Sequence, residues 1–369
     1  MEKRKISFIY WFAYYNLDSP SVRYRAKYPL GFAKKKLRIG SYFVIPGYSP
    51  AKAFKFIRAY LSALIFPGKD SLIVIQRVRS NFIYSNLLKL LVKFRKSMTV
   101  YDLDDADYLE HSPETIHFFA QNCNYISAGS EEIIKYLSQF NPRIYHITSP
   151  TPDLGIIKQQ RSKAFTIGWI GGFGLGHSES LYEYLFPAIR RLPFNCTFIL
   201  IGVTSQADRE EIKSYFVNCS HVQLEIPTDI DWNNESAIQN RIKLFDIGIA
   251  TLLPNPIQIS KSGIKAKQYM NNGVPVLCNN QPENNKVVID GYNGFICESA
   301  DEFRSRLIEF KEMEPQEYWK FSRNARKSIK DFDHYKYFED FDRIKNNEKP
   351  LYKKRSEAKK VINMVSEQF

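Results

Sequence analysis

The segment spanning residues 246–298 constrains the fold of this chain most strongly. It begins with an apolar run, residues 247–253, whose length fits a buried strand and which breaks at a proline. A polar loop follows, and then residues 264–272 show a helical pattern that ends at Gly273, a residue suited to the left-handed position after a helix. Residues 274–278 form a second apolar run. Strand, loop, helix and strand in this order predict one unit of a parallel α/β sheet.

Two lysines lie at the turn from the first strand of this segment into its helix. Lys261 precedes Ser262 and Gly263, and Lys265 follows one turn later. In a parallel α/β sheet, ligands bind at the carboxyl ends of the strands, beside helix N-termini. Both ammonium groups can therefore reach one anion of diphosphate size held near the backbone amides of Ser262 and Gly263. Lysines at such positions are also commonly solvated surface charge, so the pattern alone leaves both interpretations open.

The length of 369 residues suffices for two domains of ordinary size, each with its own core. The hydrophobic content of 44% and the charged content of 25% are typical of a globular protein. A net charge of +13 favours an anionic partner, such as nucleic acid, anionic lipid or a phosphorylated substrate. The five cysteines are scattered without a CxxC pair, which argues against a disulfide framework or a zinc site.

The start of the chain favours a cytoplasmic location. Residues 1–5 are basic, but the apolar run that follows contains Tyr and Asn and is better explained as a first strand than as a secretory signal. The longest apolar stretches, such as residues 60–67, are too short to span a bilayer. We therefore expect the protein to be made and kept in the cytosol.

Strands and helices alternate along both halves of the chain. From residue 5 to about residue 150 the pattern predicts roughly six strands with helices between them, which is typical of a doubly wound domain. A proline-rich break follows, and the alternation resumes near residue 165. We predict an α/β protein with two Rossmann-like, doubly wound domains facing a cleft. The expected parts are an N-terminal domain, a C-terminal domain, and a final helix with a basic tail that can pack back on the first domain: residues 1–155, 156–332 and 333–369.

A second glycine-rich loop follows the first strand of the second domain, in the sequence TIGWIGGFGLGHSES. Gly171, Gly172, Gly174 and Gly176 let the backbone approach a ligand closely, because glycine has no Cβ atom. A dinucleotide-binding fingerprint has a different glycine spacing, and it requires an acidic residue after the next strand, where this chain has Gly202-Val203-Thr204. A Walker A sequence is also absent. The loop therefore favours a phosphate ligand other than NAD or FAD.

Two motifs together resemble a known family. They are GWIGG with a following His, and DIGIATL…P…KSGIKAKQYMNNGVPVL…N…VVIDGYNGF. They resemble the C-terminal, donor-binding domain of family 4 (group 1) glycosyltransferases, which have the GT-B fold. The resemblance covers about residues 166–298, and it extends more loosely to the first domain through SPSVRYRA and VYDLDDADY.

The resemblance implies a hexosyltransferase-type enzyme of EC class 2.4. Such an enzyme moves a sugar from a nucleotide-diphospho-sugar to an acceptor in the interdomain cleft, commonly with retention at the anomeric carbon and without a bound metal. We therefore expect a nucleotide sugar as co-substrate, no metal and no other cofactor. The expected acceptor is lipid-linked or a surface glycan, as in bacterial polysaccharide biosynthesis. Fixed cations and amides would stabilise the charge that develops on the departing diphosphate.

Residue by residue, the resemblance places the donor diphosphate in the glycine loop and beside the two lysines. The implied contacts are Gly171, Gly172, Lys261 and Lys265, with Gly263 at the helix start.

The sugar and ribose positions depart from the family pattern. Gly174 and His177 belong to the glycine loop, and His177 can reach the donor. Family members usually carry two glutamates separated by seven residues, the first near the sugar and the second on the ribose. Here those positions are Ser260 and Gln268. Gln268 can hydrogen-bond a ribose diol, whereas Ser260 is short and neutral. Two alternatives therefore remain: a non-catalytic GT-B homologue that binds a glycan or a partner enzyme, and a sugar-nucleotide epimerase on the same scaffold.

Four aspartates cluster within residues 102–107, after the fourth predicted strand. Clustered carboxylates suit magnesium or manganese. Metal-binding DxD signatures, however, belong to the other glycosyltransferase fold, so the resemblance favours a site without metal. We expect Asp104 and Asp105 to face the cleft as catalytic candidates, where they orient an acceptor hydroxyl or pair with Arg23 and Arg25. The two arginines can instead hold an anionic acceptor such as a lipid diphosphate, or lie on an ordinary helix surface.

Basic residues also cluster in the first domain. The predicted helix 51–66 interleaves basic with apolar residues: Lys52, Lys55 and Arg58 with Phe54, Ile57 and Leu61. A basic amphipathic face of this kind can rest on an anionic membrane, so we expect peripheral association with the inner face of the cell membrane. Nucleic acid is not an expected partner, because no recognition motif accompanies the basic residues.

Overall fold

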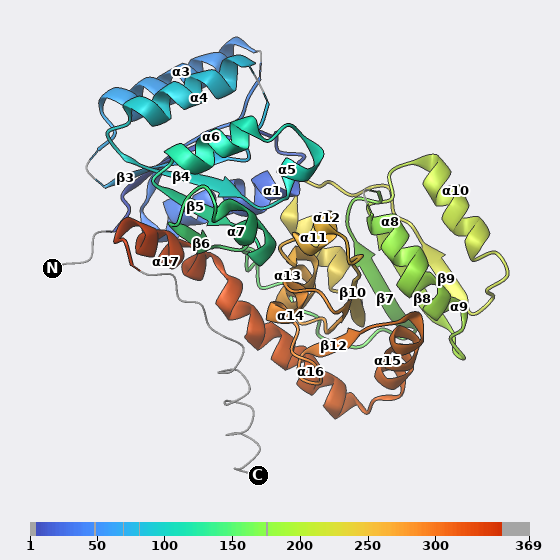
Figure 1. The fold of residues 1–369 in the computed structure, drawn as a ribbon. Helices are drawn as coiled ribbons and strands as arrows, with labels where there is room; N and C mark the ends of the chain where they lie inside the picture. Colours follow the sequence, from blue (N-terminus) through green and yellow to red (C-terminus); the bar gives the residue numbers. More distant parts are fainter. Residues whose placement is uncertain (1–4, 48, 69, 81, 175, 349–369) are drawn as a thin grey trace.

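The computed structural model describes residues 5–47, 49–68, 70–80, 82–174 and 176–348. These residues form two α/β domains, each built on a six-stranded sheet whose strands are all parallel (Figure 1). Two apolar clusters in each domain show that helices cover both faces of each sheet. The predicted architecture of two Rossmann-like, doubly wound α/β domains is therefore confirmed.

The first sheet has the strand order β2-β1-β3-β4-β5-β6. Its strands are β1 (Phe8–Ala13), β2 (Gly40–Val44), β3 (Ser71–Gln76), β4 (Met98–Leu103), β5 (Tyr125–Ala128) and β6 (Ile144–His146). The central strand β3, with the sequence SLIVIQ, is buried at every position. A parallel sheet covered by helices on both faces requires such continuous apolar strands.

Different helices cover the two faces of the first sheet. One face carries α3 (Pro50–Ile65), α4 (Phe82–Phe94), α6 (Glu114–Asn122) and α7 (Glu131–Leu137). The other face carries a continuous helical run, made of α1 (Pro20–Val22), η1 (Arg23–Lys27), α2 (Tyr28–Phe32) and η2 (Ala33–Leu37), together with α17 (His334–Lys345). A short helix, α5 (Asp107–Glu110), follows β4.

The second sheet has the strand order β12-β11-β10-β7-β8-β9. Its strands are β7 (Phe165–Ile170), β8 (Cys196–Ile201), β9 (Val222–Glu225), β10 (Ile247–Ala250), β11 (Val276–Asn279) and β12 (Gly294–Cys297). All five cysteines are buried and unpaired, as the scattered spacing predicts.

The helices of the second domain also divide between two faces. The first face carries α8 (His177–Ser180), η3 (Leu181–Leu185), α9 (Phe186–Arg190), α10 (Gln206–Tyr215) and α15 (Ala300–Glu312). The second carries α11 (Glu235–Ile242), α13 (Ile264–Asn271) and α14 (Asn284–Val287), and α16 (Pro315–Ser328) contributes to both clusters. The remaining short helices are α12 (Pro256–Ile259) and η4 (Ile329–Phe332). None of the helices in the described ranges combines the length and the apolar content that a membrane crossing needs.

The segment that constrains the fold most strongly has the predicted order of elements. Its first strand, β10, ends at Ala250, three residues earlier than predicted, and the short helix α12 occupies part of the predicted loop. Helix α13 then runs over the predicted residues, and Gly273 has a positive φ of 70° directly after it. Glycine adopts this left-handed conformation without the strain that a Cβ atom causes.

The last described helix, α17, returns to the first domain (Figure 1). Its side chains Tyr337, Phe338, Phe341 and Ile344 belong to the apolar cluster of the first sheet, where Phe341 contacts the ring of Trp11 edge-on at 6.0 Å. The chain therefore connects the domains twice, once before β7 and once before α17.

A buried ion pair lies inside the first domain. The guanidinium of Arg25 donates to both carboxylate oxygens of Asp102, to the carbonyl of Ile147 at 2.7 Å and to the hydroxyl of Ser127 at 2.9 Å. Neither charged side chain is exposed. The cluster joins the helical run after β1 to the ends of β4 and β5. Because both side chains are buried, each charge needs the other to offset the cost of its removal from water.

We predict that Arg25→Met lowers the free energy of unfolding by about 3 to 5 kcal/mol, because it leaves the Asp102 carboxylate buried without its partner. The matched control is Arg191→Met, which removes an exposed ion pair with Asp301 and should cost about 1 kcal/mol or less. Urea denaturation of both variants measures the difference. Equal losses of unfolding free energy in the two variants would show that the buried ion pair stabilises the protein no more than the exposed one.

Candidate functional site

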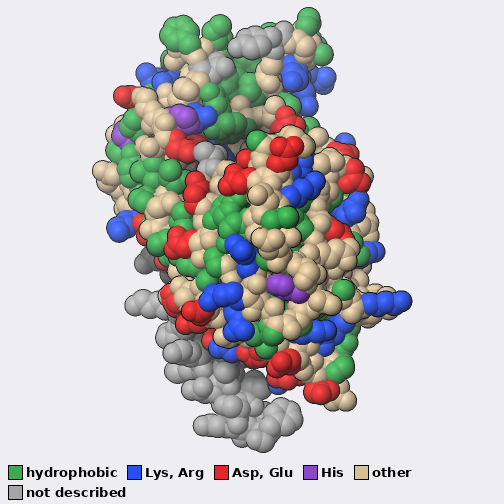
Figure 2. All heavy atoms as spheres, turned by 90° about the vertical axis from the view of Figure 1, so that its right-hand side faces the viewer, with side chains coloured by type: hydrophobic (Ala, Val, Ile, Leu, Met, Phe, Trp, Pro, Cys, Tyr) green, Lys and Arg blue, Asp and Glu red, His purple; other side chains and the backbone are tan. Residues whose placement is uncertain are grey.

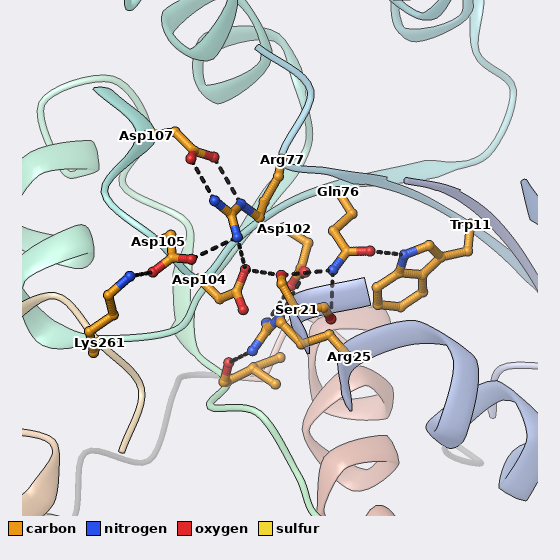
Figure 3. Close-up of polar contacts among 11 residues, drawn as sticks. Trp11, Ser21, Arg25, Gln76, Arg77, Asp102, Asp104, Asp105, Asp107 and Lys261 are labelled. Atoms are coloured by element: carbon orange, nitrogen blue, oxygen red, sulfur yellow. Dashed lines mark hydrogen bonds and ion pairs between the residues drawn. The ribbon is translucent and has the colours of Figure 1, made fainter. Parts of the chain in front are cut away.

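An ion pair joins the carboxyl end of the first sheet to the second domain. Lys261, in the loop after α12, places its Nζ 2.7 Å from Oδ1 of Asp105, which follows β4 (Figure 3). Both side chains are partly exposed, so the pair lies at an accessible junction between the domains. The sequence therefore identifies two residues, 156 positions apart, that the fold brings together.

Lys265 lies against the glycine loop that follows β7. A Cβ atom at Gly171 would come within 2.7 Å of Lys265 Cε, and the Lys265 ammonium lies 3.4 Å from the ring nitrogens of His177. The same ammonium is 5.8 Å from the ring centroid of Trp169. The structure thus brings together the predicted donor residues Gly171, His177 and Lys265.

The glycines shape this loop in different ways. A Cβ atom at Gly202, the residue after β8, would lie 1.9 Å from the carbonyl oxygen of Gly171, and Gly202 has a φ of 109°. Gly174 has a φ of 145° and Gly176 a φ of 82°, whereas Gly172 faces open space. The backbone after β7 can therefore lie close to Lys265 only because residues without side chains surround it.

Positive charge accumulates in this part of the junction. Burial and the nearby charge of Lys261 together lower the pKa of Lys265 to about 7, although Asp105 partly opposes the shift. Burial and the same two lysines also hold the pKa of His177 well below its usual value. In the described part of the chain Lys265 forms no ion pair with a carboxylate. An anion placed between the lysines would stabilise both charged ammonium groups.

The N-terminus of α13 contributes to the same site. Gly263 precedes the helix in a left-handed conformation with a φ of 65°, and Lys261 and Lys265 flank it. Lys267, which the sequence analysis did not identify, is buried behind this turn and donates to the carbonyls of Ser262 at 2.9 Å and Ser149 at 3.1 Å. Lys267 therefore ties the loop of the second domain to the segment that connects the domains.

Arg77 organises the aspartates after β4, although the sequence analysis did not single it out. Its guanidinium donates twice to Asp107, at 2.6 and 2.9 Å, and once to Asp105 at 2.7 Å (Figure 3). Arg77 has a positive φ of 51°, which is uncommon for a residue with a side chain. Such a conformation costs free energy and persists only where surrounding contacts enforce it. Arg77 therefore fixes the carboxylate that meets Lys261.

The two predicted catalytic aspartates have opposite electrostatic environments. Burial raises the pKa of Asp104 to about 6, although Arg77 and Arg25 partly oppose the shift. Burial also disfavours the charge of Asp105, but Arg77 and Lys261 outweigh it and hold its pKa well below the usual range. Asp104 accepts a hydrogen bond from the hydroxyl of Ser21. Asp105 thus stays ionised, whereas Asp104 can exchange a proton near neutral pH.

These carboxylates already have cationic partners. Within the described ranges, no group of three or more His, Cys, Asp or Glu side chains has an arrangement that could hold a metal ion. Asp102 pairs with Arg25, and Arg77 and Lys261 engage Asp105. The aspartate cluster is therefore best described as an arginine-bound network.

Arg23 and Arg25 are both buried in the first domain. Arg25 is fully buried and pairs with Asp102, whereas the sequence analysis names Asp104 and Asp105 as possible partners. Arg23 is 2% exposed and donates to the carbonyls of Leu17 and Asp18, both at 2.8 Å. Their guanidinium groups hold the loop and strand ends of the first domain, because both side chains point into the protein.

Ser260 and Gln268, at the usual glutamate positions, make internal contacts. Ser260 Oγ donates to the carbonyl of Pro256 at 2.8 Å. Gln268 Nε2 donates to the hydroxyl of Tyr24 in the first domain, and that hydroxyl donates to Glu235 at 2.7 Å. Among the described residues, no hydrogen bond links the side chain of either residue to Lys265. Gln268 instead belongs to a hydrogen-bonded chain across the two domains.

A third interdomain contact surrounds Glu283. Its carboxylate accepts from the backbone amide of Glu131, at the N-terminus of α7, at 2.9 Å and from Lys286 at 2.7 Å. His146 lies 3.2 Å away. Burial opposes the charge, but His146 and Lys286 lower the pKa of Glu283 to about 2. No local sequence pattern predicts this contact, because its members come from separate elements of both domains.

No protein-family model and no curated protein matches the sequence of this chain. Solved structures do match its fold. Anabaena HepE in complex with UDP and glucose has 13% identity and a TM-score of 0.64, over 90% of this chain and 97% of that chain. Sucrose-phosphate synthase from Thermosynechococcus elongatus has 12% identity and a TM-score of 0.67, over 92% and 98%. The lipopolysaccharide outer core galactosyltransferase WaaB has 14% identity and a TM-score of 0.61, over 91% and 98%.

The matches extend over nearly the whole length of these proteins and therefore over both domains. The chain has the GT-B fold. Within this GT-B chain, the lysines, the glycine loop and the aspartates lie at the junction where the two sheets face each other.

We predict that Gly202→Ala lowers the free energy of unfolding by about 2 to 4 kcal/mol, because its Cβ atom would overlap the carbonyl of Gly171 and its backbone conformation suits only glycine. Gly172→Ala is the control from the same loop system. Its Cβ atom would meet no atom within 4 Å, so the cost should stay within about 0.5 kcal/mol. Urea denaturation tests both, and similar stabilities would contradict the tight contact between the two loops.

Proposed function

We propose that this GT-B chain is a glycosyltransferase of the family 4 type that transfers a sugar from a nucleotide-diphospho-sugar to an acceptor at the interdomain junction. The observation that carries the proposal is the position of Lys265 and Lys261, one against the glycine loop and the other against Asp105. Solved structures with the same fold support the choice of donor, since HepE was crystallised with UDP-glucose and the pneumococcal O-GlcNAc transferase GtfA with UDP and GlcNAc.

The proposed chemistry follows from the charge of the site. When the bond between sugar and diphosphate breaks, negative charge grows on the phosphate oxygens, and fixed ammonium groups and amides bind it more strongly than in the ground state. We assign this role to Lys261 and Lys265. The backbone around the donor is supplied by the glycine loop and the start of α13, namely by Gly171, Gly172, Gly174, His177 and Gly263. Because these groups can stabilise the leaving diphosphate, we propose a transfer that needs no bound metal. Retention at the anomeric carbon is part of the proposal because the family 4 resemblance implies it.

The aspartates after β4 belong to the acceptor side of this proposal. Asp104, with a pKa of about 6, can accept a proton from an acceptor hydroxyl near neutral pH. Asp105 stays ionised and orients Lys261. We propose a lipid-linked or surface-glycan acceptor and a hexosyltransferase that works in the cytoplasm.

One observation favours a second candidate function. Gln268 and Ser260 make contacts within the protein rather than presenting carboxylates to a sugar. A GT-B homologue that binds a nucleotide sugar or glycan without cleaving it is consistent with this arrangement. Release of nucleoside diphosphate from a bound nucleotide sugar distinguishes the two functions, because only the enzyme breaks the glycosyl bond.

We predict that a nucleoside diphosphate stabilises the wild-type protein and that Lys265→Ala reduces its affinity about tenfold to a hundredfold, the worth of a hydrogen bond to a charged group. A panel of nucleoside diphosphates and their sugars in a thermal-shift assay identifies the base, and UDP is the first member to test. At about a hundred times the dissociation constant, the ligand should add about 2.7 kcal/mol of stability.

The control for this experiment is Lys213→Ala, which removes an exposed lysine on α10. It should bind like the wild type. If no nucleotide of the panel stabilises the wild-type protein, the donor site is wrong and so is the proposed transfer.

We also predict that nucleotide binding takes up a proton at alkaline pH. With a pKa of about 7, the Lys265 amine is mostly neutral at pH 8.5 in the free protein, and the diphosphate raises that pKa by favouring the ammonium. Affinity should therefore fall as pH rises above 7, by about tenfold per unit between pH 8 and 9. Calorimetry in buffers of different ionisation enthalpy counts the proton.

Lys265→Arg is the control for proton uptake, because the guanidinium is charged at every pH of the experiment. Its affinity should change little over the same range. A wild-type protein that binds the nucleotide without proton uptake would place the diphosphate away from Lys265.

A further inference from the structure

Helix α3 exposes several large apolar side chains on one face. On its other face Ala59 and Ala63 are buried, and Phe56, Tyr60 and Leu64 are partly buried against the same core cluster. Phe54, Ile57 and Leu61 are 67%, 51% and 46% exposed. They lie three to four residues apart, which places them on one face of the helix. A helix that only covers its own sheet carries its large apolar residues on the side that faces the sheet. The exposed apolar face of α3 is therefore suited to binding a partner outside the domain.

Helix α4 lies beside α3 and extends the same surface (Figure 1). The rings of Phe56 on α3 and Tyr84 on α4 pack 5.3 Å apart, which joins the two helices. Of the fourteen exposed large apolar side chains in the described ranges, nine belong to α3, to α4 or to the residue directly after α3. We define the exposed members as the α3–α4 ridge: Phe54, Ile57, Leu61, Ile65, Phe66, Phe82, Ile83, Leu90 and Phe94.

Cationic side chains flank the ridge on both sides. Arg58 lies over the ring of Tyr42 in the edge strand β2, at 5.7 Å, on the side away from α4. Lys89 and Lys93 lie over the ring of Phe118 in α6, at 5.4 and 5.8 Å, on the side away from α3. Figure 2 shows hydrophobic and basic side chains together at the top of the molecule, where Figure 1 places α3 and α4.

Acidic residues are almost absent from this part of the chain. Residues 19–101 contain 17 Lys and Arg but one acidic residue, Asp70, which gives a net charge of +16, whereas the whole chain carries +13. The remainder of the chain is therefore slightly acidic, with a net charge of −3. The ridge thus lies in the segment that carries all the excess positive charge.

We propose that the α3–α4 ridge docks on the surface of an anionic lipid bilayer. The protruding aromatic and aliphatic side chains enter the boundary between headgroups and acyl chains, while Arg58, Lys89 and Lys93 contact lipid phosphates. A bilayer satisfies both parts of the surface at once. Nucleic acid would meet the cations but leave the apolar centre without a partner, and a protein partner would need an acidic rim around an apolar groove.

The ridge also has a defined position relative to the candidate site. Strand β3 ends at Gln76, the next residue is Arg77, which holds Asp105, and α4 begins at Phe82. The N-terminal end of α4, with Phe82 and Ile83 at 85% and 70% exposure, therefore lies on the carboxyl-end side of the first sheet. If the proposed transfer is correct, a docked ridge brings the acceptor side of the junction toward lipid-borne substrates. The docking itself does not depend on that function.

Vesicle binding by the full chain tests the ridge. The wild-type protein should float with vesicles of phosphatidylglycerol and phosphatidylcholine and bind pure phosphatidylcholine much more weakly. The double variant Phe54→Ser, Ile57→Ser should lose about tenfold in affinity or more per side chain. The triple variant Arg58→Ala, Lys89→Ala, Lys93→Ala should lose about fivefold per cation and most of the preference for the anionic lipid. The control Leu154→Ser, Val217→Ser, at exposed apolar residues elsewhere, should bind like the wild type.

Three results would overturn the proposal. The first is a wild-type protein that does not bind the anionic vesicles at low salt. The second is a Phe54→Ser, Ile57→Ser variant that binds them as well as the wild type, since another part of the chain would then hold the membrane. The third is self-association of the wild type that this variant abolishes without any vesicle binding, which would assign the ridge to a second copy of the chain. These vesicle assays contain no nucleotide sugar. Their result therefore does not depend on whether the protein is a glycosyltransferase, and the two proposals can fail separately.

Discussion

The contact from Arg77 through Asp105 to Lys261 is the interaction on which the candidate site depends. Arg77 holds Asp107 and Asp105 at once, and Asp105 in turn meets Lys261 from the other domain. Without Arg77, the aspartates after β4 would repel one another, and burial would favour their protonation. The strained backbone of Arg77 is therefore compensated by an ordered carboxylate that both positions a lysine and joins the domains. In the proposed transfer, an entering diphosphate would compete with Asp105 for the Lys261 ammonium, so donor binding would weaken this contact between the domains.

The sequence predicts the fold well where the signal is local. The buried run before the lysine loop and the glycine after α13 each determine their own conformation, so the strand–loop–helix–strand unit was predictable. Lys261 and Lys265 were identified for the same reason, since four residues of spacing suffice to place them near one helix start. The early end of β10 was not predictable, because the backbone of Leu252 hydrogen-bonds the side chain of Asn279, 27 positions away, instead of the backbone of a neighbouring strand.

The remainder of the site depends on distant residues. Arg77 and Asp107 are 30 positions apart, and Gln268 and Tyr24 are 244 positions apart. No periodicity links such residues, because only the packed domains bring them together. The burial of Arg23 and Arg25 was not predictable for a related reason. A basic helix beside a strand end has the same sequence pattern whether its arginines face solvent or a buried carboxylate, and here Asp102 supplies the carboxylate.

Helix α3 has apolar residues on two faces, one toward the domain core and one toward solvent. One face packs on the domain core through its alanines and the partly buried Phe56, Tyr60 and Leu64, while the phenylalanine, isoleucine and leucine on the opposite face remain exposed. Exposed apolar groups of this size favour association with any apolar surface. The surrounding positive charge favours an anionic partner over a second copy of the chain, because two positively charged copies repel one another and an anionic surface attracts them. Lys261 and Lys265 lie outside this basic segment, in the part of the chain whose net charge is −3. The proposed membrane surface and the proposed phosphorylated donor would therefore be bound by separate groups of cations.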